Sequence, residues 1–239
     1  MKDLRELPIK IFADGADLKE MLAIYKTGVV KGFTTNPSLM KKAGVSDYKT
    51  FAQNVLKQIK DCSVSFEVFA DKFEKMEREA DVLAGLAPNV YVKIPVTNTK
   101  GVSSVPLIRK LSEKGYHLNI TAIFTLKQVQ EVVDALDSNT ENIVSVFAGR
   151  IADTGVNAAD LMKKASAICK KKPRIQLLWA SCREFYNILE AVETGCSIIT
   201  VPNNILTKRV NYGKDLSEYS LETVCGFYED ASKLGFSIL

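Results

Sequence analysis

The sequence has few of the residues that most metal and redox sites require. Its 239 residues include one histidine, His117, and five cysteines without any C-x-x-C pair. A single histidine excludes a multi-histidine metal site and leaves any Ser-His-Asp triad dependent on that one residue. An odd number of unpaired cysteines indicates neither a disulfide framework nor a four-thiolate zinc site. We therefore expect reduced thiols at all five positions, which are Cys62, Cys169, Cys182, Cys196 and Cys225.

Motifs for nucleotides and nucleic acids are also missing. No two of the 13 glycines stand two positions apart, so the chain has no G-x-G-x-x-G loop, and it has no G-x-x-x-x-G-K-[ST] loop either. The net charge of +4 is mild, and no stripe of lysine and arginine with interleaved aromatic residues accompanies it. We expect no nucleic-acid partner, because the basic excess fits a small anionic ligand better.

Long apolar runs are absent as well. The longest stretch without a charged residue, 194–207, has 14 residues and contains Pro202, whereas a spanning helix needs roughly 20 mostly apolar residues. The start of the chain carries Lys2, Asp3, Arg5 and Glu6 and lacks the apolar segment of a secretory signal. We therefore expect a cytoplasmic protein with no membrane partner.

What the sequence does contain is a regular alternation of short apolar runs and longer segments with a period near 3.6 residues. The runs are rich in Val, Ile and Phe and begin near Lys10, Gly32, Val64, Val90, His117, Ile143, Arg174 and Ile198. The helical segments are expected at 17–26, 46–59, 72–86, 104–114, 126–136, 158–170, 183–193 and 221–234. Eight such units predict an α/β protein, a single (β/α)8 TIM-barrel domain over residues 1–239 with an extra C-terminal helix. A doubly wound open sheet is the alternative.

Polar residues gather at the predicted strand ends, which is where a (β/α)8 barrel carries its chemistry. Seven of the eight strands have them: Asp14; Thr34, Thr35 and Asn36; Glu67; Lys93; Asn119 and Thr121; Ser145 and Arg150; and Ser181 and Arg183. We expect these side chains to meet at one mouth of the barrel.

Lys93 is the most unusual residue in this set. It lies inside the strand YVKIP, where alternation places it on the face opposite Val92 and Ile94. Burial of an ammonium favours the neutral, nucleophilic amine, which suits Schiff-base chemistry with a carbonyl substrate. The alternative is a lysine that extends from the strand end to water. Glu67 and Asp14 could perform the accompanying acid and base steps, or could form a buried ion-pair network that only fixes packing.

Six motifs follow one another in order: GFTTNPSL (32–39), SFEVFAD (65–71), VKIPVT (92–97), LNITAIF (118–124), SVFAGRIADTG (145–155) and LLWASCR (177–183). From about residue 10 to residue 205 the chain resembles the transaldolase family, in particular its short members, which include the fructose-6-phosphate aldolases.

The resemblance implies a role for each of these positions. Lys93 matches the Schiff-base lysine, and Glu67 matches the glutamate that moves protons through a water held by Thr121. Asp14 matches the aspartate that takes the proton of the C4 hydroxyl. The expected substrate-binding residues are Asn36, Asn119 and Ser145 for the dihydroxyacetone hydroxyls, Phe147 for the pocket wall, and Arg150, Ser181 and Arg183 for the phosphate. Thr34 is also expected to bind substrate.

The resemblance also implies a metal-free enzyme without a cofactor that assembles as a pentamer or decamer. The final predicted helix carries Leu221, Phe227, Tyr228 and Leu234, which could cover a neighbouring subunit or the chain's own barrel. The positions after Leu206 match the family pattern poorly.

Two positions favour transfer over cleavage. Fructose-6-phosphate aldolases usually carry glutamine at the position of Glu67 and tyrosine at that of Phe147. The expected function is therefore a transaldolase of the pentose phosphate pathway. It would pass a dihydroxyacetone unit from sedoheptulose 7-phosphate or fructose 6-phosphate to an aldose phosphate. The alternatives are an aldolase that releases dihydroxyacetone, a transaldolase for a related sugar such as a sulfonated ketose, and a non-catalytic barrel that binds sugar phosphates.

Overall fold

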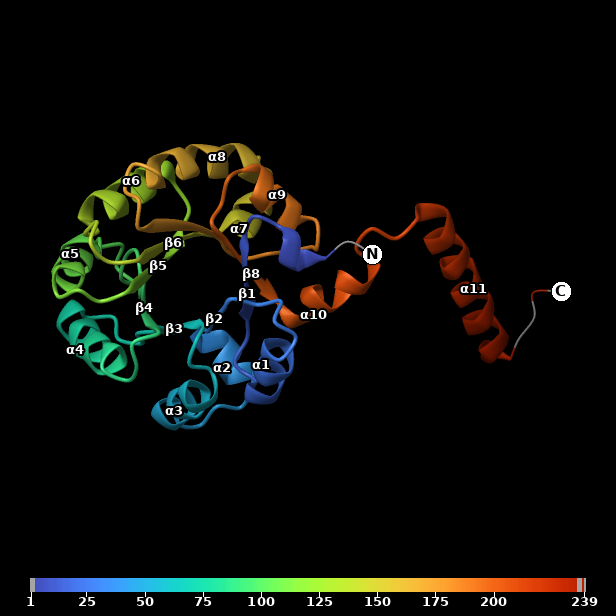
Figure 1. Cartoon of the computed structure of the whole chain (residues 1–239), viewed down its shortest axis with the longest axis horizontal. Helices are drawn as coiled ribbons and strands as arrows, with labels where there is room; N and C mark the ends of the chain where they lie inside the picture. Colours follow the sequence, from blue (N-terminus) through green and yellow to red (C-terminus); the bar gives the residue numbers. More distant parts are fainter. Residues whose placement is uncertain (1–2, 236–237, 239) are drawn as a thin grey trace.

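Eight parallel strands form a closed barrel in chain order in the computed structural model, which describes residues 3–235 and 238 (Figure 1). The strands are β1 (Lys10–Asp14), β2 (Gly32–Thr34), β3 (Ser63–Glu67), β4 (Val90–Pro95), β5 (Leu118–Ile123), β6 (Asn142–Val146), β7 (Ile175–Trp179) and β8 (Ile198–Pro202). Each begins within one residue of the predicted position. Because β1 pairs with β8, the predicted barrel is confirmed and the open-sheet alternative is wrong.

The eight predicted helices surround the barrel or follow it. They are α1 (Leu18–Tyr25), α3 (Tyr48–Gln58), α4 (Phe73–Ala84), α5 (Val105–Glu113), α6 (Leu126–Ala135), α8 (Ala158–Cys169), α9 (Asn187–Glu193) and α11 (Leu216–Leu234). Polar N-caps fix several of their starts, as when the Thr125 hydroxyl and the Gln128 side chain form a reciprocal capping box at α6. The described chain also has short helices that the periodicity did not predict: α2 (Pro37–Lys42), α7 (Ala148–Ala152), α10 (Asn203–Leu206), η1 (Leu4–Glu6) and η2 (Thr207–Asn211).

Two predicted helix starts were wrong, each because a polar side chain fixes a different one. Helix α9 begins at Asn187 rather than at residue 183. The Asn187 side-chain oxygen accepts the backbone N–H groups of Arg183 and Glu184 and holds these residues in a turn. The final helix begins at Leu216, five residues before the predicted start, because Asp215 caps it by accepting the N–H groups of Ser217 and Glu218.

An apolar layer fills the middle of the barrel and separates its two mouths. It consists of Phe12, Tyr91, Ile143, Leu178, Ala180 and Ile198, which form a cluster distinct from the larger core between the strands and the helices. Gly32 makes room for this layer, because a Cβ there would lie 2.5 Å from the Phe12 ring. By alternation, the residues two positions further along each strand face the carboxyl-end mouth.

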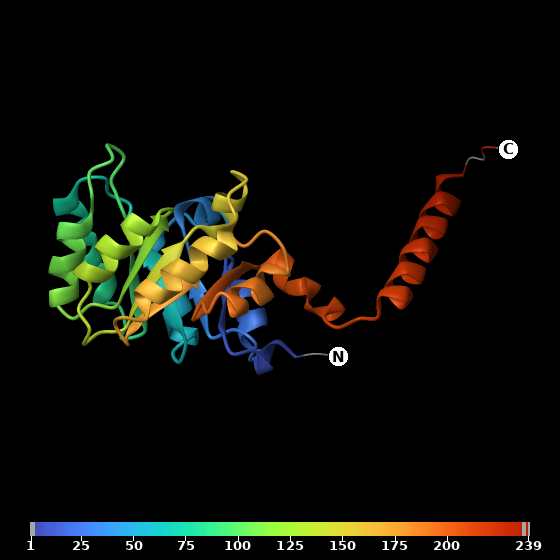
Figure 2. The same ribbon diagram turned by 90° about the horizontal axis from the view of Figure 1, so that it is seen from above.

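The last helix stands apart from the barrel (Figures 1 and 2). None of the residues of α11 is buried. Even its large apolar side chains are exposed, with Leu216 at 81%, Phe227 at 71% and Tyr228 at 75%. In this chain the helix therefore does not cover its own barrel. Among the described residues, no helix is both long enough and apolar enough to cross a membrane.

Candidate active site

The structure brings the twelve sequence-predicted site residues together at the carboxyl-end mouth of the barrel. Glu67 and Asn119 contact other members of the set through side-chain interactions. The other ten line one cavity of about 190 Å³: Asp14, Thr34, Asn36, Lys93, Thr121, Ser145, Phe147, Arg150, Ser181 and Arg183.

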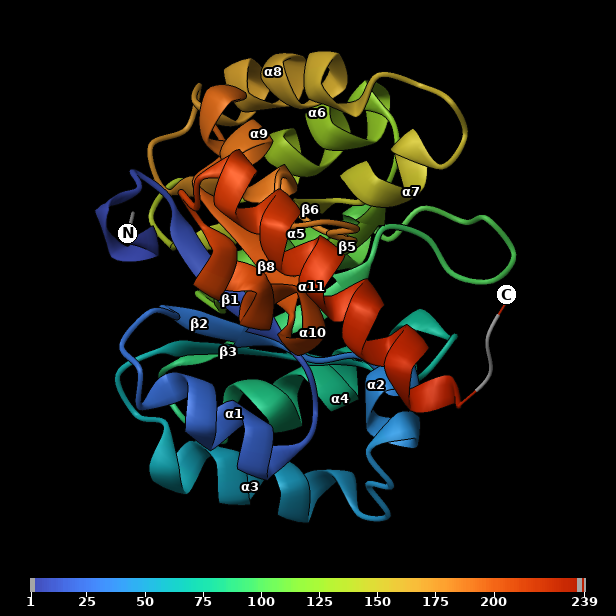
Figure 3. The same ribbon diagram turned by 90° about the vertical axis from the view of Figure 1, so that its right-hand side faces the viewer.

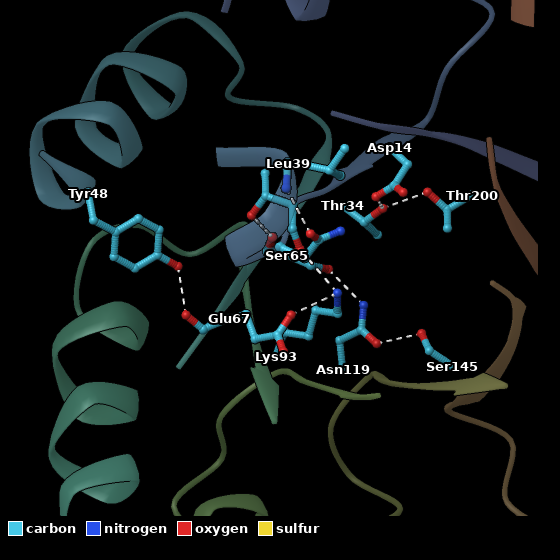
Figure 4. A network of polar contacts seen from close by, with 12 residues as sticks. Asp14, Thr34, Leu39, Tyr48, Ser65, Glu67, Lys93, Asn119, Ser145 and Thr200 are labelled. Atoms are coloured by element: carbon cyan, nitrogen blue, oxygen red, sulfur yellow. Dashed lines mark hydrogen bonds and ion pairs between the residues drawn. The ribbon is translucent and has the colours of Figure 1, made fainter. Parts of the chain in front are cut away.

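Lys93 occupies the centre of this mouth (Figure 4). The strand register pairs it with Glu67 of β3 on one side and with Asn119 of β5 on the other. Its Nζ lies 3.0 Å from Glu67 Oε2 and donates a hydrogen bond of 3.1 Å to the Thr35 carbonyl oxygen. The Lys93 side chain is only 8% exposed, so the alternative of a lysine that extends to water does not fit the structure.

The ion pair gives this site a ready path for protons. A lysine must lose a proton before it can attack a carbonyl, and a carboxylate in direct contact can accept one. Both partners are shielded from water, with the Glu67 side chain 16% exposed. Removing one of them would leave the other as an uncompensated, poorly solvated charge.

Asp14 ends β1 on the same side of the barrel. Its Oδ1 accepts a hydrogen bond of 2.7 Å from the Thr34 hydroxyl. Burial raises the pKa of the Asp14 carboxyl above its usual range, against the opposing effects of the Lys93 charge and the Thr34 hydrogen bond. A carboxyl group in such an environment is suited to exchange a proton with a substrate hydroxyl.

Thr200 of β8 extends this hydrogen-bonded chain and was missed in the sequence. Its hydroxyl lies 2.6 Å from Thr34 Oγ1. Because the one proton of the Thr34 hydroxyl goes to Asp14, Thr200 must be the donor to Thr34. Alternation could have found it, since Ile198, Thr200 and Pro202 share one face and Thr200 is the polar member of that face.

A second series of hydrogen bonds links side chains of β3, β5 and β6. The Ser145 hydroxyl donates to Asn119 Oδ1 at 2.6 Å, and Asn119 Nδ2 donates to the Ser65 hydroxyl at 2.9 Å (Figure 4). These two bonds fix which end of the amide points to each neighbour. Ser65, two residues before Glu67 on the same strand face, is another positioning residue that the sequence analysis missed.

Two further polar groups remain available to a ligand. The Thr121 hydroxyl is buried and has no hydrogen-bond partner among the described residues, so a substrate or a water molecule could satisfy it. Asn36 caps α2, where its Oδ1 accepts the Leu39 N–H at 3.0 Å. Asn36 also lines the cavity, and the capping bond leaves its Nδ2 hydrogens free to donate to a ligand.

Two arginines stand at the outer rim. The Arg150 guanidinium lies 5.3 Å from the centre of the Phe147 ring, and Arg183 forms an ion pair with Asp153. Gly149 allows α7 to approach the loop after β7, because a Cβ there would lie 1.7 Å from the Ser181 carbonyl oxygen. Ser181 itself has a φ of 64°, a left-handed conformation that is uncommon for a residue other than glycine.

Comparisons with known proteins point to one family. Residues 11–238 match the family model described as transaldolase/fructose-6-phosphate aldolase. A probable transaldolase of Dehalococcoides mccartyi is 35% identical over 205 residues, which cover 85% of this chain and 91% of that protein. A probable transaldolase of Caldicellulosiruptor saccharolyticus is 34% identical over 227 residues, covering 94% and 99%.

More distant structures share the barrel alone. A putative fructose-1,6-bisphosphate aldolase from Coccidioides immitis superimposes with a TM-score of 0.55 at 14% identity, covering 88% of this chain and 83% of that one. A putative phosphonomutase from Burkholderia cenocepacia gives a TM-score of 0.56 at 13% identity, with 95% and 96% covered.

Proposed function

Because the chain belongs to the transaldolase/fructose-6-phosphate aldolase family, we propose that it is a transaldolase that works through a Schiff base on Lys93. The observation that carries the proposal is the buried contact between Lys93 and Glu67, 3.0 Å apart, in a mouth that also holds Asp14. The proposed donors are sedoheptulose 7-phosphate and fructose 6-phosphate, and the proposed acceptor is an aldose phosphate. This reaction would belong to the pentose phosphate pathway in the cytoplasm.

Imine formation is the first proposed step. The Lys93 amine, after giving its extra proton to Glu67, attacks the C2 carbonyl carbon of the ketose and forms a carbinolamine. Glu67 then returns a proton to the C2 hydroxyl, through a water held by Thr121, and that hydroxyl leaves as water. The position of Glu67 beside Nζ supports this role, and so does the Thr121 hydroxyl, which has no hydrogen-bond partner within the described part of the chain.

Cleavage follows when Asp14 takes the proton of the C4 hydroxyl. The C4–O bond becomes a carbonyl, the C3–C4 bond breaks, and its electron pair moves into the iminium to give an enamine on Lys93. The aldose phosphate then leaves. Addition of a second aldehyde reverses these steps, and hydrolysis of the new imine frees the product. The raised pKa of Asp14 favours its protonated form, which is the form needed to return the proton.

The phosphate group is proposed to lie at the rim, between Arg150 and Arg183. Guanidinium groups pair with two phosphate oxygens at once, and both arginines line the cavity. Arg150→Ala or Arg183→Ala should therefore raise KM for fructose 6-phosphate, by about 10- to 100-fold if a charged hydrogen bond of ~1.5–3 kcal/mol is lost. The check is to compare KM for fructose 6-phosphate with KM for unphosphorylated fructose. An equal increase for both sugars would contradict this placement.

Phe147 supports transfer rather than release. The centre of its ring lies 5.6 Å from that of Phe124 and 5.3 Å from the Arg150 guanidinium, and the ring offers no hydroxyl to position a water at the enamine. We therefore propose that the enamine persists until an aldehyde acceptor arrives.

The test measures dihydroxyacetone formed per glyceraldehyde 3-phosphate, with and without erythrose 4-phosphate. Fructose 6-phosphate alone should give little free dihydroxyacetone, and erythrose 4-phosphate should restore rapid turnover. Phe147→Tyr, combined with Glu67→Gln, should move the ratio toward release. A ratio near one without acceptor in the unchanged enzyme would make it an aldolase. Turnover only with a sulfonated ketose would select that alternative, and binding without turnover would leave a sugar-phosphate-binding barrel.

A second copy of this chain is the proposed partner of α11, in a pentamer or decamer. The helix carries large apolar side chains that are 43–81% exposed, including Leu216, Tyr219, Val224 and Phe227. Exposed apolar area of this kind usually marks an interface.

Removing residues 215–239 should therefore convert the assembly to monomers, while the barrel keeps its circular dichroism spectrum. Sedimentation velocity of the full chain and of the truncated chain is the measurement. A full chain that sediments as a monomer would refute this assignment.

A further inference from the structure

A second, larger cavity opens at the opposite mouth of the barrel. It has a volume of about 1020 Å³ and lies on the other side of the apolar layer that contains Phe12, Ile143 and Ile198. In Figure 3 the blue segment that leads into β1 lies on this side, away from α2 and α7. The interior of such a barrel is filled by packed side chains, and small-molecule sites have roughly 300–1,000 Å³. The cavity is therefore large enough for a metabolite.

Its lining carries more positive than negative charge. Four cationic side chains and two carboxylates, those of Asp61 and Glu141, line it. Tyr25 donates a hydrogen bond to Asp61, and Tyr91 donates one of 3.1 Å to Glu141 Oε2. Both carboxylates have neutral hydrogen-bond partners, and neither forms an ion pair with these cations within residues 3–235.

Three of the cations are lysines with no ion pair in the described part of the chain. Lys10 Nζ donates to the side-chain oxygen of Gln176 at 3.0 Å, and Lys31 Nζ donates to a backbone carbonyl oxygen at 3.2 Å. Lys60 lines the same cavity, and no carboxylate within residues 3–235 forms an ion pair with it. The fourth cation, Arg5, pairs with Asp3. All three lysines are exposed and none forms an ion pair within the described residues, so around one cavity they together create a positive field that attracts an oxyanion.

The wall beside these lysines contains a stacked pair of rings and a backbone hydrogen bond. The rings of Tyr91 and His117 stack with centroids 5.0 Å apart, and His117 Nδ1 lies 3.0 Å from the Glu141 backbone oxygen. Because that oxygen can only accept, Nδ1 carries a hydrogen, and in the uncharged tautomer with that hydrogen Nε2 is an acceptor. The wall can therefore accept a hydrogen bond from a ligand hydroxyl.

We propose that this amino-end cavity is a binding site for a small phosphorylated metabolite, with Lys10, Lys31 and Lys60 as its phosphate-binding residues. The cavity is separate from the mouth that holds Lys93. Binding here does not depend on the reaction proposed for the other mouth.

The experiment is calorimetric titration with inorganic pyrophosphate at low ionic strength. All proteins carry Arg150→Gln and Arg183→Gln, which remove the phosphate contacts proposed at the other mouth. The test protein adds Lys10→Gln, Lys31→Gln and Lys60→Gln. The matched control instead adds Lys163→Gln, Lys164→Gln and Lys171→Gln, exposed lysines that change the net charge equally.

The parent protein, which carries only Arg150→Gln and Arg183→Gln, should bind pyrophosphate saturably. The test protein should bind it at least 10-fold more weakly, and the affinity of the control should lie within about 3-fold of that of the parent. Lys60→Glu alone should also weaken binding, which tests the site with a single exposed change. No saturable binding to the parent would overturn the proposal. An equal loss in the control would overturn it too, because it would assign binding to net charge rather than to the cavity.

Discussion

Lys93→Ala is expected to reduce kcat for fructose 6-phosphate by about 10⁴-fold or more, the scale on which enzymes lose activity with their covalent nucleophile. Lys93 is the only buried lysine among the described residues, so no other amine stands ready to replace it at this mouth. Without the amine there is no imine, and without the imine the C3–C4 bond has no electron sink. Steady-state assay with fructose 6-phosphate and erythrose 4-phosphate measures the loss.

Loss of the fold must be separated from loss of the chemistry. Removing Lys93 leaves Glu67 without its partner, and the free energy of unfolding should fall for that reason alone. The control is Lys93→Met combined with Glu67→Gln, which removes both charges and should recover stability in urea denaturation while remaining inactive. Recovery of activity in this double variant would refute the Schiff-base role.

Borohydride trapping tests the role of Lys93 through covalent labelling rather than through loss of activity. Reduction in the presence of fructose 6-phosphate should add one ligand-derived mass to the peptide that contains Lys93. The Lys93→Ala protein should remain unlabelled. Labelling of a different lysine would show that the imine forms elsewhere.

The sequence predicted well those features that depend on the periodicity of apolar residues and on polar residues inside apolar strands. A lysine between Val92 and Ile94 breaks an apolar strand, and Glu67 breaks the preceding one in the same way. Since parallel strands in a barrel end at one mouth, the positions of these residues in the chain were enough to predict that they meet. The 3.0 Å contact between them follows from the register of β3 and β4.

What the sequence did not predict depends on contacts between distant segments. The left-handed backbone of Ser181 and the close approach of Gly149 to it are set by packing between two loops. Ser65 and Thr200 are small hydroxyl residues inside apolar strands, where they are common, and only their partners give them a role. The helix over Leu216–Leu234 was predicted in kind, but periodicity contains no information on where an amphipathic helix docks.

Asp14→Asn is the second variant expected to have a very large effect. Loss of a positioned base typically costs ~10²–10⁴-fold in rate, and we expect kcat to fall within that range. Because the Lys93–Glu67 pair is untouched, the imine should still form, and borohydride should still label Lys93 with fructose 6-phosphate. The variant is thus expected to separate imine formation from carbon–carbon cleavage. Failure to trap the imine would assign Asp14 to the first step instead.

The pH dependence supplies an independent check on the same residue. Burial raises the Asp14 pKa, so the carboxylate is lost as the pH falls through a value above the ordinary ~3.9 of aspartic acid, and kcat/KM for fructose 6-phosphate should fall with it. The Thr34 hydrogen bond opposes that rise. Thr34→Val should therefore move the acid limb to higher pH, and Thr200→Val should move it less in the same direction, because Thr200 acts only through Thr34. An acid limb that stays in place in Thr34→Val, or that persists unchanged in Asp14→Asn, would assign the titration to another group.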